Sequence, residues 1–158
     1  MAAQMAEHRM ADRRAGTGLT PDALIAGLAG TWQLRRAIDD RLGDGPSRFD
    51  GEASFTPVEG GLDYVEIGDL VLPDGSTLAG HRAYAWRIVA DRVHVTFPDG
   101  RPFHEFDPAK AAPTAVHLCE PDTYRVRYGF DLPDLWRAVW DVSGPRKEYR
   151  MESTYTRF

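Results

Sequence analysis

The sequence has little of the features that mark several large protein classes. It contains one cysteine, Cys119, in 158 residues, which excludes an internal disulfide, and one thiolate cannot build a structural zinc site alone. No apolar run reaches the roughly 18 to 20 residues that cross a bilayer as a helix. Acidic residues outnumber basic ones, 24 to 19, and the net charge of −5 argues against a protein that neutralises nucleic-acid phosphates.

The length matches one domain of about 150 residues, and 42% apolar residues can fill one core. The first 18 residues hold few apolar side chains and no continuous apolar segment of the kind found in secretory signals. We therefore predict a flexible leader at residues 1–18, a single domain at residues 19–158 and, with the lone thiol kept reduced, a cytoplasmic location. The oligomeric state stays open, and a homodimer is compatible with the sequence.

Residues 20–22, Thr-Pro-Asp, form a helix-start signal, because they suit the cap, the first helical position and the positive end of the helix dipole. The short helix that follows has three apolar residues on one side: Leu24, Ile25 and Leu28. We expect Gly27 and Gly30 to end it before the first strand, so that it caps one end of the domain.

No sustained helical period follows; short aromatic and β-branched runs alternate with Pro, Gly and Asp instead. These runs predict about ten strands: 31–39, 48–57, 61–72, 76–89, 92–97, 101–107, 114–120, 123–131, 135–143 and 147–158. The separators are hairpin-like, so neighbouring strands are antiparallel. An all-β, up-and-down antiparallel β-barrel removes the two sheet edges that such a meander would leave, and a two-sheet sandwich is the alternative.

Period-two alternation predicts which side chains face the interior. The inward sets are Phe49, Gly51, Ala53 and Phe55; Arg82, Tyr84, Trp86 and Ile88; Tyr124, Val126, Tyr128 and Phe130; and Tyr149, Met151, Ser153 and Tyr155. An inward Arg82 needs a partner, because burying an unpaired guanidinium costs several kcal/mol. We expect water, a carboxylate such as Glu66, or a ligand to supply it.

Residues 30–32, Gly-Thr-Trp, lie at the start of the first strand after the short helix, and Arg157 lies near the chain end. This pattern resembles the calycin superfamily of lipocalins, fatty-acid-binding proteins, avidins and nitrobindins. The resemblance implies a calycin-like barrel in which a terminal arginine, Arg157 rather than Arg150, packs across Trp32. The wider pattern, including residues 99–104, 117–119 and 144–147, resembles a family of uncharacterised, mainly bacterial domains over about residues 27 to 158. That second resemblance implies no function.

If Trp32 marks the closed end, every even-numbered strand of the meander starts at the open end. The loops before the fourth, sixth, eighth and tenth strands then share one rim. They bring seven chemically active residues toward the mouth: Arg101, His104, His117, Cys119, Tyr124, Arg146 and Lys147. Aromatic residues and Arg82 lie behind them. We predict that a small apolar or aromatic, anionic molecule binds in the lumen, in contact with Tyr64, Arg82, Tyr84, Trp86, Arg101, His104, His117, Tyr128, Trp140, Arg146 and Lys147.

A cofactor-independent enzyme, such as an isomerase, cyclase or hydratase, is the alternative. In it His104 or His117 moves a proton while Tyr124 or Arg82 stabilises negative charge. A haem-binding barrel, allowed by the nitrobindin resemblance, ranks third, and zinc held by the two histidines and Cys119 has no familiar spacing. We expect no dedicated cofactor and no metal.

Each site residue also has a structural interpretation. The histidines can be satisfied by backbone or water, and the Arg146–Lys147 turn can be simply solvated. Arg82 can pair with Glu66. The lone thiol is expected to be a buried small hydrophobe rather than a nucleophile, and Trp136 and Trp140 are expected to pack in the core.

Overall fold

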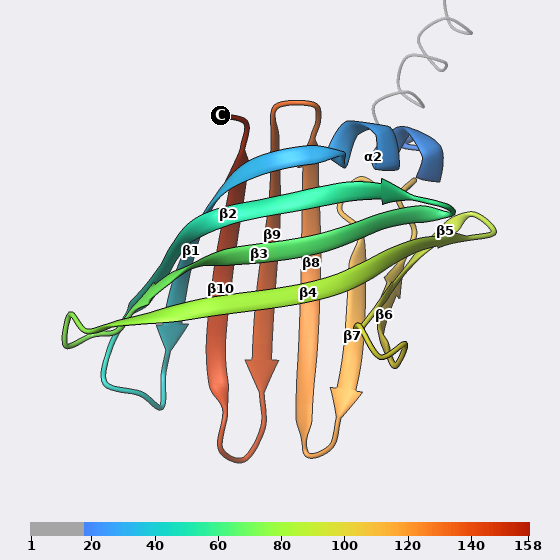
Figure 1. The fold of residues 1–158 in the computed structure, drawn as a ribbon. Helices are drawn as coiled ribbons and strands as arrows, with labels where there is room; N and C mark the ends of the chain where they lie inside the picture. The colour runs from blue at the N-terminus through green and yellow to red at the C-terminus, as the bar shows by residue number, and fades with distance from the viewer. Residues whose placement is uncertain (1–17) are drawn as a thin grey trace, which may run out of the picture.

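The computed structural model describes residues 18–158, which form one short helix and ten strands (Figure 1). The elements are α2 (Pro21–Leu28), β1 (Gly30–Asp40), β2 (Ser47–Val58), β3 (Gly61–Val71), β4 (Thr77–Val89), β5 (Arg92–Thr96), β6 (Pro102–Phe106), β7 (Thr114–Cys119), β8 (Asp122–Asp131), β9 (Leu135–Ser143) and β10 (Glu148–Thr156). Every predicted strand is present, with ends within about two residues of those expected. The predicted leader, apart from Gly18, lies outside the described residues.

The ten strands form one antiparallel sheet in the order β6-β5-β4-β3-β2-β1-β10-β9-β8-β7. β1 pairs with β2 on one side and with β10 on the other, so the first and last strands join the two halves of the meander. In Figure 1 the strands β2–β4 cross in front of β8–β10 at a steep angle, and the sheet curls into a nearly closed barrel. The predicted up-and-down barrel is therefore confirmed, and the sandwich is wrong.

Helix α2 covers one end of this barrel. The Thr20 hydroxyl accepts a hydrogen bond from the Ala23 amide at 3.1 Å, with Pro21 in the first turn, as predicted. Leu24 and Leu28 are fully buried. Gly27 does not end the helix, contrary to expectation. It lies within the last turn, where an added Cβ would come within 2.8 Å of Leu132. Its role is close packing against a neighbouring loop.

Arg157 closes the same end of the barrel. Its guanidinium lies 3.6 Å from the centroid of the Trp32 ring, so the contact implied by the calycin resemblance is confirmed. The other candidate, Arg150, pairs with Asp141 on the outside of the sheet instead. Gly30 makes the contact with Arg157 possible, because its φ of +113° is left-handed and an added Cβ would lie 3.0 Å from the guanidinium.

Inward side chains of β2, β3 and β4 lie in rows across the sheet, because the three strands pair in register. The rows, from the closed end outward, are Phe55, Tyr64 and Tyr84; Ala53, Glu66 and Arg82; Gly51, Gly68 and Gly80; and Phe49, Leu70 and Leu78. The inward faces predicted for β2 and β4 are thus observed, and the inward residues of β3 follow the same alternation. No helix within residues 18–158 has the length and apolar character to cross a membrane.

Candidate functional site

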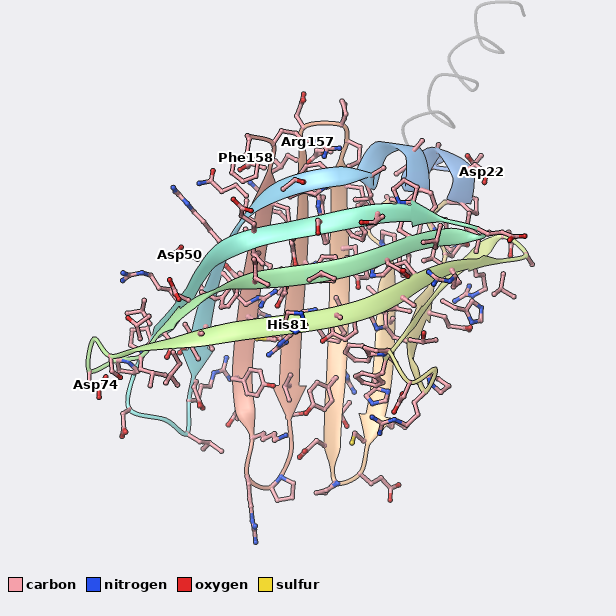
Figure 2. The ribbon with its side chains drawn as sticks, in the orientation of Figure 1. Asp22, Asp50, Asp74, His81, Arg157 and Phe158 are labelled. Atoms are coloured by element: carbon pink, nitrogen blue, oxygen red, sulfur yellow. The ribbon has the colours of Figure 1, made fainter. Side chains whose placement is uncertain are left out.

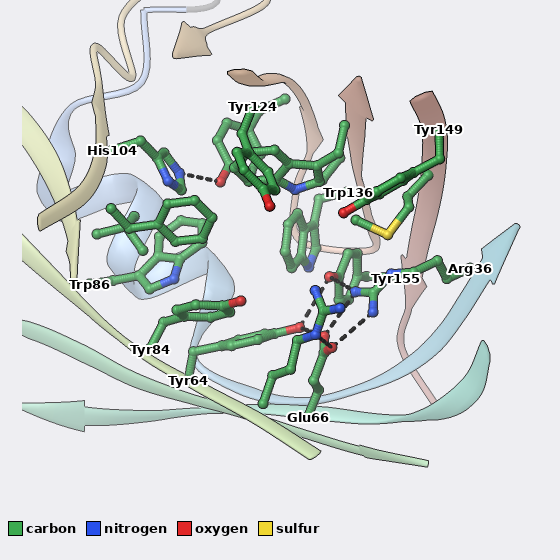
Figure 3. Close-up of a pocket in the computed structure, with 17 residues that line it drawn as sticks. Arg36, Tyr64, Glu66, Tyr84, Trp86, His104, Tyr124, Trp136, Tyr149 and Tyr155 are labelled. Carbon is green, nitrogen blue, oxygen red and sulfur yellow. Dashed lines mark hydrogen bonds and ion pairs between the residues drawn. The ribbon is translucent and has the colours of Figure 1, made fainter. Parts of the chain in front are cut away.

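A cavity of about 200 Å³ lies inside the barrel, and it combines an aromatic wall with a charged floor (Figure 3). Most strands contribute side chains to it because the curled sheet turns their inward faces toward one another. The wall consists mainly of aromatic residues: Tyr64, Tyr84, Trp86, Phe103, Tyr124, Tyr128, Trp136, Trp140, Tyr149 and Tyr155. Such a wall provides a large apolar surface at low conformational cost.

The charged floor is centred on a buried ion pair between Arg36 of β1 and Glu66 of β3. Two parallel hydrogen bonds join them, from Nη1 to Oε1 at 2.8 Å and from Nη2 to Oε2 at 2.9 Å. The Nε of Arg36 donates to the Ser153 hydroxyl at 2.7 Å. The Tyr64 hydroxyl donates to Oε2 of Glu66 at 2.5 Å and lies 3.1 Å from the Tyr155 hydroxyl. This network links β1, β3 and β10 across the barrel.

Electrostatics keeps the pair charged and the phenols neutral. Burial disfavours the carboxylate of Glu66, but the hydrogen bonds and charge of Arg36 outweigh burial and lower its pKa. Burial also opposes the charge of Arg36, yet the hydrogen bond to Glu66 raises its pKa overall. Burial, then the neighbouring Tyr155 and Glu66, raise the pKa of Tyr64. The tyrosine therefore remains a proton donor over the physiological range.

Arg82 is the second cation of the cavity and lies at its edge. Its side chain is 50% exposed, and its Nε forms a long ion pair with Oε1 of Glu66, at 3.9 Å and beyond hydrogen-bond range, so the expected pairing with Glu66 is present only in this weaker form. The close partner of Glu66 is Arg36, which the sequence analysis did not assign to the interior. The alternation of β1 contains the missed signal, since Trp32, Leu34 and Arg36 share one face. Two arginines and one glutamate leave the floor with one surplus positive charge.

His104 belongs to the buried wall and is 8% exposed. Its Nε2 lies 2.7 Å from the Tyr128 hydroxyl, while its Nδ1 is buried without a hydrogen-bond partner among residues 18–158. Burial, with a smaller contribution from His117, lowers its pKa from 6.5 to about 3. The imidazole is therefore neutral near pH 7 and a weak base. The indole Nε1 of Trp136, on the same wall, is likewise buried without a partner in this part of the chain.

The structure brings most of the predicted site residues to one cavity. Those that line it are Tyr64, Arg82, Tyr84, Trp86, His104, Tyr124, Tyr128 and Trp140. The remaining four, Arg101, His117, Arg146 and Lys147, are outside the lining. Phe103, Tyr149 and Tyr155 line the cavity although the sequence analysis did not select them as ligand contacts. Tyr149 and Tyr155 were nevertheless predicted to be on the inward face of β10.

The four outside residues have other surroundings. Arg101 is exposed and pairs with Asp99 at 2.6 Å. Lys147 donates to the Tyr124 hydroxyl at 3.1 Å, and Arg146 is exposed in the same hairpin. His117 contacts the rings of three neighbours: Phe97, Phe103 and Tyr124. These residues form a partly charged rim near the cavity, and their contact with a ligand remains a prediction.

Cys119 is exposed, so the expectation of a buried small hydrophobe is wrong. The residue shares a face of β7 with the buried Ala115, but it is the last residue of that strand, opposite the first residue of β8. The alternative zinc site also lacks support, since no group of three or more His, Cys, Asp or Glu within residues 18–158 is arranged to hold a metal ion.

Comparisons with known proteins place the chain in a family. Residues 28–157 match DUF6314, a family of unknown function. The chain belongs to this family. A search of curated proteins found no match.

Two solved structures share the architecture of this DUF6314 member. One is the S-type phycobiliprotein lyase CPES from Guillardia theta, with 10% identity, a TM-score of 0.66 and coverage of 89% of this chain and 93% of that chain. The other is a protein of unknown function from the DUF3598 family of Nostoc punctiforme, with 11% identity, a TM-score of 0.59 and coverage of 85% and 49%. At these identities the likeness concerns the fold, and it supports the barrel.

Proposed function

We propose that the barrel binds a small aromatic organic anion in its cavity. The observation that carries this proposal is that the guanidinium of Arg82 is half-exposed and has hydrogen-bond donors that Glu66 does not use. Both oxygens of Glu66 already accept hydrogen bonds from Arg36, so the charge of Glu66 is satisfied without Arg82. The half-exposed guanidinium of Arg82 thus keeps donors for a carboxylate or a similar anion, beside a wall of aromatic rings.

The size of the cavity limits the ligand. An apolar cavity of about 150 Å³ takes up benzene, so a volume of about 200 Å³ suits one ring with a small polar group. Aromatic side chains such as Tyr84 and Trp140 favour a planar ring through offset and edge-to-face contacts.

The enzyme alternative receives less support. A histidine with a pKa of about 3 is almost entirely neutral near pH 7 and is a poor general base. Neutral His104 instead suits a role as a fixed hydrogen-bonding group. The arrangement therefore disfavours His104 as the base of such an enzyme, while the half-exposed Arg82 favours binding of an anion.

Ligand-observed NMR and calorimetry with benzoate, phenylacetate and indole-3-acetate test the proposal. We expect at least one of these anions to bind at millimolar or lower Kd and its neutral amide to bind at least tenfold more weakly. Arg82→Gln should weaken binding of the anion about tenfold and remove its advantage over the amide. Arg48→Gln, an exposed arginine that pairs with Asp50 on the outer face of β2, is the matched control and should change neither. Binding by none of the three anions, or equal binding by wild type and Arg82→Gln, would overturn the proposal.

Native mass spectrometry of protein purified under gentle conditions gives an independent test. A co-purifying aromatic acid is the expected result. A bound molecule that is cationic or has no ring would contradict the proposed ligand class.

A further inference from the structure

A second hollow of about 230 Å³ adjoins the cavity, and nothing in the proposed function uses it. Its wall is mainly aliphatic where the first wall is aromatic, with Ile38, Leu70 and Leu78 as examples. Arg36, Glu66, Arg82 and Met151 line both spaces. The ion cluster therefore lies at the junction between an aromatic compartment and an aliphatic one.

A row of three glycines crosses the sheet beside the second hollow, and one of them, Gly80, lines it. Gly51, Gly68 and Gly80 stand opposite one another on β2, β3 and β4. This glycine row lies between two other rows of inward residues. One contains Glu66 and Arg82, and the other contains Leu70 and Leu78. An added Cβ at Gly51 would lie 2.1 Å from the Ile67 carbonyl oxygen, so these strands approach too closely for a side chain. Backbone atoms at Gly51 and Gly68, and the Phe49 ring at Gly80, thus occupy the positions that side chains would take in this row.

Phe49 shapes the aliphatic side of the row. Its ring packs over Gly80, where an added Cβ would lie 2.8 Å from the ring edge. The guanidinium of Arg36 lies 5.4 Å from the centroid of the same ring. Phe49 is 6% exposed, whereas Leu78 is 53% exposed at the outer edge of the hollow. An apolar chain that lies between them would cover the exposed leucine.

We propose that the second hollow binds an alkyl branch of the same ligand, which makes the ligand class an aromatic anion with a short alkyl chain next to its anionic group. This inference rests on the proposed function. Arg82 lines both compartments, so an anion paired with it sits at their junction. The ring and the chain of one ligand then diverge from the carbon that carries the carboxylate.

A series of phenylacetates tests the branch position. The probes are phenylacetate, 2-phenylbutanoate and 2-phenylhexanoate, with 4-butylphenylacetate as an isomer of the last. Each buried methylene strengthens binding up to about fourfold. We expect 2-phenylhexanoate to bind at least tenfold more tightly than phenylacetate. The isomer, whose chain leaves the far side of the ring, should bind no more tightly than phenylacetate because its chain meets the aromatic wall.

Variants that fill the second hollow with a larger side chain provide a second test of the alkyl subsite. Leu70→Trp should reduce the affinity ratio of 2-phenylhexanoate to phenylacetate from at least ten to about one. Ile67→Trp, on the outer face of the same strand and 54% exposed, is the matched control and should keep the ratio. Thermal unfolding checks that each variant folds, and Ile38→Phe replaces Leu70→Trp if the latter does not.

The outcomes separate the two proposals. If no phenylacetate binds and the other aromatic anions also fail, the proposed function is wrong. If phenylacetate binds but the α-alkyl series gains nothing, or if the filling variants keep the ratio, the alkyl subsite is wrong while the aromatic site stands.

Discussion

Arginine serves different purposes at the two ends of this barrel. At the closed end, Arg157 stacks on Trp32 and its guanidinium donates to backbone carbonyls of Gly27, Ala29, Thr31 and Pro133. At the cavity, Arg82 is half-exposed and lies beside a glutamate that Arg36 already satisfies. Figure 2 labels Arg157 near the closed end and Asp74 in the β3–β4 hairpin, on opposite sides of the molecule.

The difference shows how the same residue type becomes structural or functional. An arginine whose donors all meet carbonyls contributes to stability, and its loss leaves those carbonyls unpaired. An arginine with donors to spare contributes little to folding and keeps them for a ligand. Three arginine substitutions test this contrast, and a fourth, at His104, tests the burial of the cavity wall; the largest expected effect comes first.

Arg36→Met should destabilise the fold by about 3 to 5 kcal/mol, because it leaves the Glu66 carboxylate buried without its cation. Urea unfolding at pH 7 measures the change. The double variant Arg36→Met with Glu66→Gln should recover part of the loss, since no unpaired charge remains. A single variant as stable as wild type would show that the network is not buried in solution.

Arg157→Met should destabilise by about 2 to 3 kcal/mol, because charge-assisted hydrogen bonds to carbonyls at the end of α2 are lost. Thermal and urea unfolding provide the measurement. Binding of the aromatic anion should stay within twofold of wild type in the fraction that is folded. Weaker binding with unchanged stability would reverse the roles assigned to the two ends.

His104 should make stability depend on pH. Its pKa is about 3 in the folded protein and 6.5 in the reference state, so the unfolded chain takes up a proton that the folded chain excludes between these values. Stability therefore falls as the pH drops below about 6.5, by about 2 kcal/mol at pH 5. Urea unfolding at pH 8 and pH 5 should show this loss in wild type and in His81→Gln, an exposed control, but not in His104→Gln. An equal loss in all three proteins would count against the buried neutral histidine.

Arg82→Gln should change stability by less than about 0.5 kcal/mol, the smallest effect of the four, because the residue is half-exposed and outside the buried pair. Urea unfolding without ligand checks this. A loss as large as that of Arg157→Met would show that Arg82 is structural and would weaken the proposed anion site.

The strands were predictable because their limits depend on local signals. Turn residues between short aromatic runs predicted ten strands to within about two residues, and alternation predicted the inward faces of four of them: β2, β4, β8 and β10. The Trp32–Arg157 contact followed from the resemblance to a calycin pattern. The partner of Glu66 was missed because Arg36 is 30 residues away in the chain, and the choice between two inward arginines depends on how the sheet curls.

Most residues of the candidate site were predictable, but the rim residues among them do not line the cavity. Parity of the strands brought the correct rim loops together, yet it could not tell how far each side chain lies from the lumen. Cys119 and Arg101 lie where strands end, and both are exposed. The glycine row was visible in the sequence, but its meaning depends on the pairing of three strands in register.

The sequence by itself determined a ten-stranded meander, its inward faces and the capped end, because turn propensity and period-two alternation are local properties. Only the tertiary structure decided which arginine pairs with Glu66, which leaves donors for a ligand, and where the interior remains hollow. Those outcomes depend on distances between strands far apart in the chain, and burial then sets the charge and hydrogen bonding of each group.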